Sequence, residues 1–207
     1  MYGEEMEIIM KENLKEGKGI VEDFSKDFDQ FIIDTAEENT LQIVLRGHLY
    51  IEREITSFLK LALKEPQEVI TERTFYGNKL SLAYALGILS KDDKISCKNL
   101  GEIRNSYAHK WGFEVKEVDF DKLVSSFKGD LKKHYELFRN PNHSLAARLA
   151  AAIGVMFIHL RLLIEKYKNS KELESIKIDI GETEMQRMLF NKENRELMKY
   201  IEENYKL

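Results

Sequence analysis

Proline is almost absent from this chain, and its absence limits how the chain can fold. Only two of the 207 residues are proline, Pro66 and Pro141, so a helix is forced to stop at few points. An all-β sandwich would need many turn signals from glycine, proline and Asn-Gly pairs. The chain has only eleven glycines. The composition therefore favours an all-α fold, and the length predicts one main domain.

Apolar periodicity and turn signals divide the central region into helices. Pro66 is expected to end the helix over 41–63, and the helix over 97–109 is expected to break near Gly112. The charged segment 91–94 is predicted to be a turn. Asp119 or Asp121 is predicted to cap the helix that runs to about Phe138. The expected helices are 41–63, 76–89 (apolar almost all round and therefore buried), 97–109, one running to about Phe138, and, after the turn Asn140-Pro141-Asn142, one over 144–167.

Three regions are expected along the chain. Residues 1–38 are predicted to form a helical extension, and residues 39–168 the helical bundle. Residues 169–207 are predicted to form an arm, with a short strand over 176–180 and an amphipathic helix from residue 182. The flanking helices would pack on the bundle or on a second subunit.

The chain is expected to work in the cytoplasm, without a membrane span. The acidic N-terminus has no long apolar stretch, so no signal peptide is predicted. Residues 145–164 have transmembrane length, but Arg148, His159 and Arg161 interrupt them, which favours a core helix. Cys97 is the single cysteine, so no internal disulfide can form, and it is interpreted as a small residue packed within a helix.

Charge and motif searches exclude several classes of function. The 32 Lys and Arg against 36 Asp and Glu give a net charge of −4, which is not the global footprint of a nucleic-acid-binding protein. Any RNA contact must therefore be local. The chain has neither a phosphate-binding loop motif nor a dinucleotide fingerprint, and its histidines and cysteine lack zinc-ligand spacing, so we expect no cofactor and no metal.

Two polar residues interrupt the apolar stripe of the 41–63 helix. His48 and Glu52 are four residues apart and so lie on one face. A buried carboxylate is costly unless it is paired. The pair is interpreted either as a His–Glu contact, as a glutamate that anchors an arginine, or as part of a catalytic site.

The 97–109 helix carries an arginine on its apolar side. Arg104 falls beside Leu100 and Tyr107, so its guanidinium needs an anionic partner. That partner is either a carboxylate such as Glu52 or an oxyanion of a substrate. His109 lies five residues on, about 140° around the helix, so helix geometry alone does not bring it to Arg104. At the helix C-terminus His109 also interacts favourably with the helix dipole.

The chain contains, in order, RGHLYIEREITSFLKLAL at 46–63, FYGNKLSLAYALGIL at 75–89 and NLGEIRNSYAH at 99–109. The last segment ends in RNSYAH, which matches the R-N-x-x-x-H pattern of the HEPN superfamily. The three segments together resemble helices of the MltR-like branch of that superfamily, which is named after a mannitol operon repressor. The resemblance covers roughly residues 40–165.

This resemblance implies an antiparallel helical bundle that dimerises and places Arg and His of two subunits in a shared cleft. His109 would act as general base or acid, Arg104 would hold the scissile phosphate, and Asn105 would orient the phosphate or His109. Glu52 is a candidate second partner of the site. The implied activity is metal-independent RNA cleavage of toxin or defence type, with an antitoxin or regulatory protein as a further partner. The alternative is a non-catalytic MltR-like transcriptional regulator that acts through protein contacts.

RNA binding would need a local positive surface. Tyr107 and Trp111 flank His109, and each would stack on a base or form interface core. The remaining histidines, His134, His143 and His159, are expected to have packing or surface roles. The candidate basic residues, which otherwise form a solvated helix face, are Lys110, Lys128, Lys132, Lys133 and Arg139.

Overall fold

The computed structural model describes residues 30, 33 and 39–171. The chain divides into two compact units, Met1–Ile164 and Glu165–Leu207. Apart from residues 30 and 33, the extension expected over 1–38 lies outside the described residues. The arm over 176–180 and the helix from residue 182 lie outside them as well.

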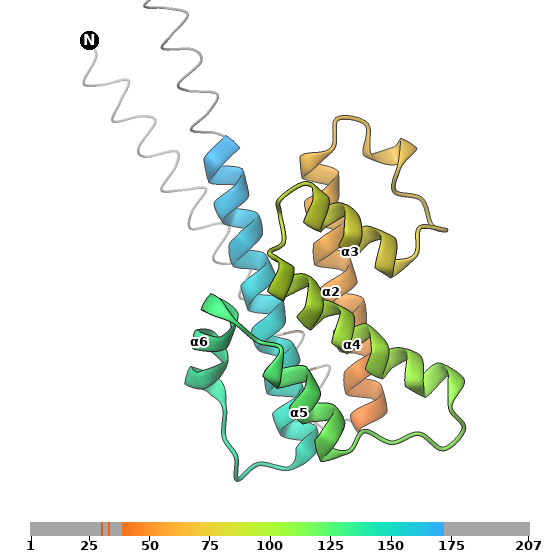
Figure 1. The fold of residues 1–207 in the computed structure, drawn as a ribbon, viewed down its shortest axis with the longest axis vertical. Helices are drawn as coiled ribbons and strands as arrows, with labels where there is room; N and C mark the ends of the chain where they lie inside the picture. The colour runs from red at the N-terminus through yellow and green to blue at the C-terminus, as the bar shows by residue number, and fades with distance from the viewer. Residues whose placement is uncertain (1–29, 31–32, 34–38, 172–207) are drawn as a thin grey trace, which may run out of the picture. The chain divides into compact units, whose positions relative to one another are not determined.

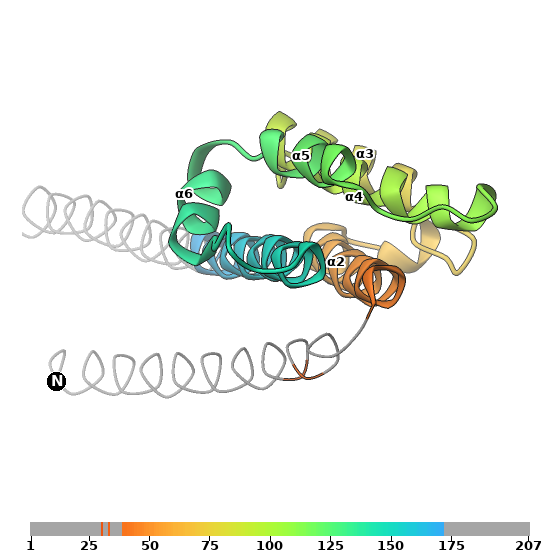
Figure 2. The same cartoon turned by 90° about the horizontal axis from the view of Figure 1, so that it is seen from below.

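The described part of the chain is an all-α bundle, as predicted, and contains no strand (Figure 1). Helix α2 packs on α3 and α4, α3 packs on α4, and α4 packs on α5. Seen from below, α3, α4 and α5 form one layer, and α2 lies in a second layer beside the final helix (Figure 2). The elements are α2 (Thr40–Ala62), the 3₁₀ helix η1 (Pro66–Glu68), α3 (Tyr76–Ala85), α4 (Lys91–His109), α5 (Glu117–Ser125), α6 (Gly129–Phe138) and the helix Leu145–Lys171.

Helix α2 forms where the sequence predicted it. Asn39 caps its N-terminus, since the Asn39 side chain accepts a hydrogen bond of 3.1 Å from the backbone N–H of Gln42. The helix ends before Pro66, which begins η1. Gly47 allows the final helix to approach closely, because a Cβ there would lie 2.5 Å from Cγ2 of Ile153.

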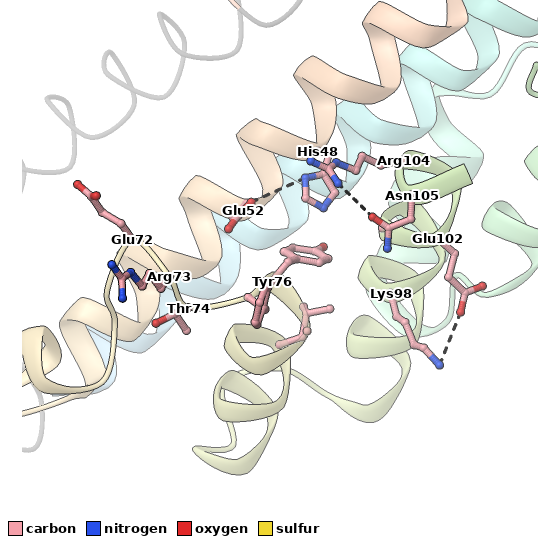
Figure 3. A pocket seen from close by; sticks show the side chains of 14 residues that line it. His48, Glu52, Glu72, Arg73, Thr74, Tyr76, Lys98, Glu102, Arg104 and Asn105 are labelled. Atoms are coloured by element: carbon pink, nitrogen blue, oxygen red, sulfur yellow. Dashed lines mark hydrogen bonds and ion pairs between the residues drawn. The ribbon is translucent and has the colours of Figure 1, made fainter. Parts of the chain in front are cut away.

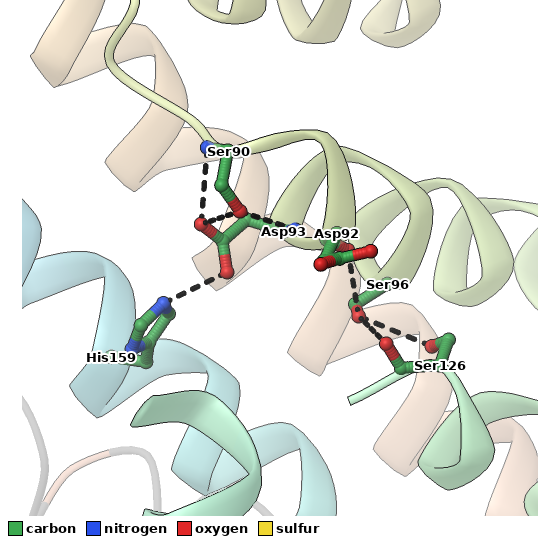
Figure 4. Close-up of polar contacts among 6 residues, drawn as sticks. All are labelled: Ser90, Asp92, Asp93, Ser96, Ser126 and His159. Atoms are coloured by element: carbon green, nitrogen blue, oxygen red, sulfur yellow. Dashed lines mark hydrogen bonds and ion pairs between the residues drawn. The ribbon is translucent and has the colours of Figure 1, made fainter. Parts of the chain in front are cut away.

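Helix α4 begins earlier than predicted, and the expected turn at 91–94 is its first turn. The Ser90 hydroxyl accepts a hydrogen bond of 3.1 Å from the backbone N–H of Asp93, and Oδ2 of Asp93 accepts one of 3.1 Å from the N–H of Ser90 (Figure 4). This reciprocal pair is a capping box, which satisfies two orphan N–H groups. The acidic residues that suggested a turn therefore stabilise a helix N-terminus.

Helix α3 is less buried than predicted. Of its residues only Leu80 and Ala83 are buried, and Tyr84 keeps 44 % of its surface exposed. The helix packs on α2 and α4 from the rim of the bundle. Its apolar residues therefore do not all face a neighbouring helix, although the composition is apolar nearly all round.

The single helix expected before Phe138 is two helices, α5 and α6. Residues 126–128 separate them, and Gly129, the first residue of α6, has a φ of 51°, in the left-handed region that glycine adopts readily. Asp119 does cap α5, but from inside it. Its Oδ2 accepts a hydrogen bond of 3.0 Å from the backbone N–H of Lys116, the residue that precedes the helix. The turn at 140–142 is present as predicted, with the N–H of Asn142 bonded to Oδ1 of Asn140.

The helix Leu145–Lys171 is long and apolar enough to cross a membrane by length and composition alone. Its first part, up to residue 164, is instead largely buried in the bundle, as predicted for a core helix. The basic residues that interrupt its apolar run each meet a carboxylate from another helix. The pairs are Arg148–Glu117, His159–Asp93 and Arg161–Glu54.

Candidate functional site

A cavity of about 820 Å³ opens between α2, α4 and the segment that leads into α3 (Figure 3). Helix α2 contributes His48 and Glu52 to it, and α4 contributes Arg104 and Asn105. The other residues of its wall are Glu72, Arg73, Thr74, Phe75, Tyr76, Gly77, Leu80, Lys98, Gly101 and Glu102. We call it the α2–α4 cavity.

Tyr76 forms the floor of the α2–α4 cavity because Gly101 leaves room for its ring. A Cβ on Gly101 would lie 3.0 Å from Cε1 of Tyr76. The Tyr76 hydroxyl donates a hydrogen bond of 3.0 Å to the backbone oxygen of Cys97, and its ring centroid lies 4.3 Å from that of His48. Burial raises the pKa of Tyr76 well above its usual value. Cys97 lies within α4, as predicted; it is buried, and burial raises its thiol pKa to about 12.

His48 and Glu52 contact each other across one helical turn, as their spacing predicted. Nδ1 of His48 lies 3.8 Å from Oε2 of Glu52, and Oε1 of Glu52 accepts a hydrogen bond of 2.7 Å from Nζ of Lys79. Burial lowers the pKa of His48, and Arg104 and Lys79 lower it further, while the Glu52 carboxylate opposes them. The surroundings of His48 therefore favour its neutral form.

Arg104 is an exposed residue in the wall of the α2–α4 cavity, which corrects the expectation that it lies on the inner face of its helix. The side chain is exposed, and its Nη1 donates a hydrogen bond of 3.2 Å to Oδ1 of Asn105. Glu52, one of its expected partners, is bound by Lys79 instead. Within residues 39–171, Arg104 forms no ion pair. The arrangement therefore leaves a guanidinium without a counter-ion at the mouth of the cavity.

His109 lies at a different place, in the wall of a second cavity. This cavity has a volume of about 1090 Å³ and lies where the C-terminus of α4 meets the start of α2. His109 is the exposed last residue of α4. Arg104 and Asn105 do not line this second cavity, so one subunit does not bring the R-N-x-x-x-H residues into one pocket. The five-residue spacing predicted the separation of Arg104 from His109, whereas the four-residue spacing of Asn105 and His109 did not predict theirs.

The basic residues expected to bind RNA do not surround the α2–α4 cavity. Lys128, Lys132, Lys133 and Arg139 lie along α6 and at its ends, where Lys133 pairs with Asp130 at 2.8 Å and Arg139 with Glu136 at 3.0 Å. Of the residues that were expected to bind RNA, Lys110 and Tyr107 line the second cavity.

The remaining histidines have the packing and surface positions that were expected. His143 contacts Asn140 at 3.0 Å on the surface, and buried His159 contacts Asp93 at 2.9 Å. The ring of His134 lies 6.0 Å from that of His159.

Sequence reasoning missed Lys79, Tyr76 and Gly101. Lys79 and Tyr76 belong to α3, and nothing in their own spacing shows that this helix lies against His48. Gly101 did leave a signal, since a glycine inside a helix often marks a close approach.

No protein-family model, no curated protein and no solved structure matches this chain. Its function must therefore be inferred from the chemistry of its own residues.

Proposed function

We propose that this protein is a metal-independent endoribonuclease that acts as a homodimer. The Arg104 guanidinium carries the proposal. It lines the α2–α4 cavity beside Asn105 and His48, and it has no carboxylate partner among the described residues. A guanidinium that lacks a counter-ion is suited to an oxyanion, because its fork of N–H donors matches two oxygens of a phosphate.

In this proposal the 2′-hydroxyl of RNA attacks the adjacent phosphorus. A bond forms between O2′ and phosphorus, the bond from phosphorus to O5′ breaks, and the products end in a 2′,3′-cyclic phosphate and a 5′-hydroxyl. His109 takes the 2′ proton or supplies the proton that O5′ needs. Arg104 stabilises the charge that develops on the phosphate oxygens, and Asn105 orients its guanidinium. DNA is excluded as a substrate because it lacks the attacking hydroxyl.

The proposal requires two subunits. Arg104 and His109 of one chain line separate cavities. A composite site therefore forms when Arg104 of one subunit faces the corresponding histidine of a second copy. Activity of this kind suits a toxin or defence protein, whose partner would be an antitoxin.

The decisive experiment incubates the purified protein with single-stranded and structured RNA in EDTA. Cleavage is expected to persist in EDTA and to fall about 100-fold or more in Arg104→Ala and in His109→Ala. Lys91→Ala, at the other end of α4, and His143→Ala are matched controls, and they should cleave like wild type. No cleavage of any RNA by the wild-type protein would sink the proposal.

A non-catalytic MltR-like regulator is the second candidate. Leu41, Leu45 and Leu49 follow one another at four-residue spacing along α2, and all three are exposed. An exposed apolar stripe of this kind is suited to a protein partner. If this candidate is right, no RNA is cleaved, and Leu45→Glu and Leu49→Glu disrupt a complex that Arg104→Ala leaves intact.

A further inference from the structure

A tight turn at the end of α4 holds a tryptophan out in solvent. The backbone N–H of Phe113 donates a hydrogen bond of 3.2 Å to the oxygen of Lys110, and Trp111 and Gly112 are the two central residues of this turn. Gly112 has a φ of 68°, as the third residue of a type II turn requires. Trp111 therefore occupies a defined place in the second cavity, two residues after His109.

The indole of Trp111 contributes nothing to the packed core. Its relative exposure is 105 %, the highest of the exposed large apolar residues. A tryptophan that is fully open to water forgoes the large hydrophobic stabilisation that its burial would give. Such a side chain, presented on an ordered turn, is suited to a binding role.

Tyr107, the other aromatic residue near His109, is already engaged. Its hydroxyl donates a hydrogen bond of 2.9 Å to Oγ1 of Thr40 and accepts one of 3.3 Å from the backbone N–H of Val115. Its ring packs edge-on against Phe113, with 4.9 Å between the centroids. Tyr107 thus anchors the segment that follows the turn, and Trp111 is the aromatic face left open.

We propose that Trp111 stacks on an unpaired base of the RNA substrate, and that the enzyme therefore selects single-stranded RNA. This inference rests on the proposed ribonuclease function. Lys110 and His109 line the same cavity as Trp111 and supply contacts for the adjoining phosphates. Glu114 is the one acidic residue among the residues that line it. Aromatic side chains recognise unstacked RNA bases in this way, because a base inside a duplex has no free face.

The chain offers a direct test, because Trp111 is its only tryptophan. The probe is a 2′-O-methyl RNA strand of about eight nucleotides, which cannot be cleaved and matches the size of a single-strand site. Titration of the full-length protein with this strand should quench the tryptophan emission and saturate. The same strand annealed to its complement should quench it far less.

Affinity is measured separately, by the anisotropy of a labelled strand. Trp111→Ala is expected to weaken binding about 5- to 150-fold, while Trp111→Phe keeps most of the affinity. The control Leu137→Ala, which trims another strongly exposed apolar residue, on α6, should bind like wild type.

The outcomes separate this inference from the proposed function. If RNA is cleaved but Trp111→Ala binds and cleaves like wild type, the inference fails and the ribonuclease stands. If RNA binds with quenching but is not cleaved, the ribonuclease fails and the stacking role stands. If the tryptophan emission of the protein alone is blue-shifted and this shift disappears on dilution, a second copy covers Trp111, and the inference is overturned. Absence of both binding and cleavage overturns both.

Discussion

Arg104 and His48 share the α2–α4 cavity, and the charge of Arg104 adds to burial in lowering the pKa of His48. The imidazole is buried, which disfavours its charged form, and the nearby guanidinium acts in the same direction. Glu52 opposes both but is itself bound by Lys79. The α2–α4 cavity thus places the Arg104 guanidinium near a buried imidazole whose neutral form the surroundings favour, and Arg73 and Lys98 also line it.

The titration of His48 tests this arrangement without any RNA. The pKa of His48 should lie below the ordinary value of about 6.5. It should rise in Arg104→Ala, which removes a positive neighbour, and fall further in Glu52→Gln, which removes the negative one. The C2–H resonance of His48, followed by NMR against pH and assigned with His48→Gln, reports these shifts. Lys91→Ala should leave the curve unchanged. A curve that does not respond to Arg104→Ala would show that the two groups do not interact.

The sequence predicted some of these residue contacts and not others, for physical reasons. His48 and Glu52 are joined by helix geometry alone, so their spacing was sufficient. Lys79 reaches Glu52 from α3, across 27 positions of sequence, and only tertiary packing creates that contact. Arg104 was expected to be buried because the periodicity places it near Leu100, yet an edge position on the helix leaves it exposed.

At the scale of elements, one buried contact joins the start of α4 to the final helix. Asp93 bonds through one carboxylate oxygen to Ser90 and through the other to Nε2 of His159 (Figure 4). Burial alone would raise the pKa of Asp93, but the hydrogen bonds from His159 and Ser90 outweigh it and lower the pKa. The carboxylate thus caps one helix and ties it to another.

Removal of this carboxylate should destabilise the bundle strongly. Asp93→Ala is expected to cost about 3–5 kcal/mol of unfolding free energy, because it leaves buried His159 without its partner. Asp92→Ala, at the exposed neighbouring position, should cost less than about 1 kcal/mol. Urea denaturation measures both. Equal losses of unfolding free energy in the two variants would contradict a stabilising contact between Asp93 and His159.

The same contact gives acid sensitivity a definite sign. Since the pKa of Asp93 is lowered in the fold, its stabilisation is present above the unfolded value of about 3.9. It is lost as the pH falls through the lower folded value.

The elements show where sequence reasoning succeeds for this fold. Helix α2 and the helix from Leu145 have strong apolar periodicity. Pro66 follows the end of α2 and Pro141 precedes the start of the other helix, so the positions of both helices were predictable. The first turn of α4 was not, because charged residues are typical of both turns and helix N-termini. The capping-box spacing of Ser90 and Asp93 is the local signal that distinguishes the two cases, and the sequence reasoning did not use it.

At the scale of the whole molecule, the proposed mechanism depends on a second copy. The α2–α4 cavity holds Arg104, and the second cavity holds His109. The length and composition predicted an all-α bundle, but no sequence pattern states which surfaces of two copies meet. A mass near that of one 24.3 kDa chain in light scattering at micromolar concentration would contradict the dimer.

Pairs of differently tagged subunits test whether Arg104 and His109 act in trans. A purified heterodimer of Arg104→Ala with His109→Ala has one intact composite site of two, so it should cleave RNA at about half the wild-type rate. Each variant alone should be inactive. The matched heterodimer pairs a wild-type subunit with one that carries both substitutions, and it should be inactive, because neither composite site then keeps both groups. If the two residues act within one subunit, the results reverse, and the wild-type subunit of the matched heterodimer keeps its activity while the first heterodimer has none. The two heterodimers carry the same substitutions in equal number, so a difference between them can come only from which residues share a site.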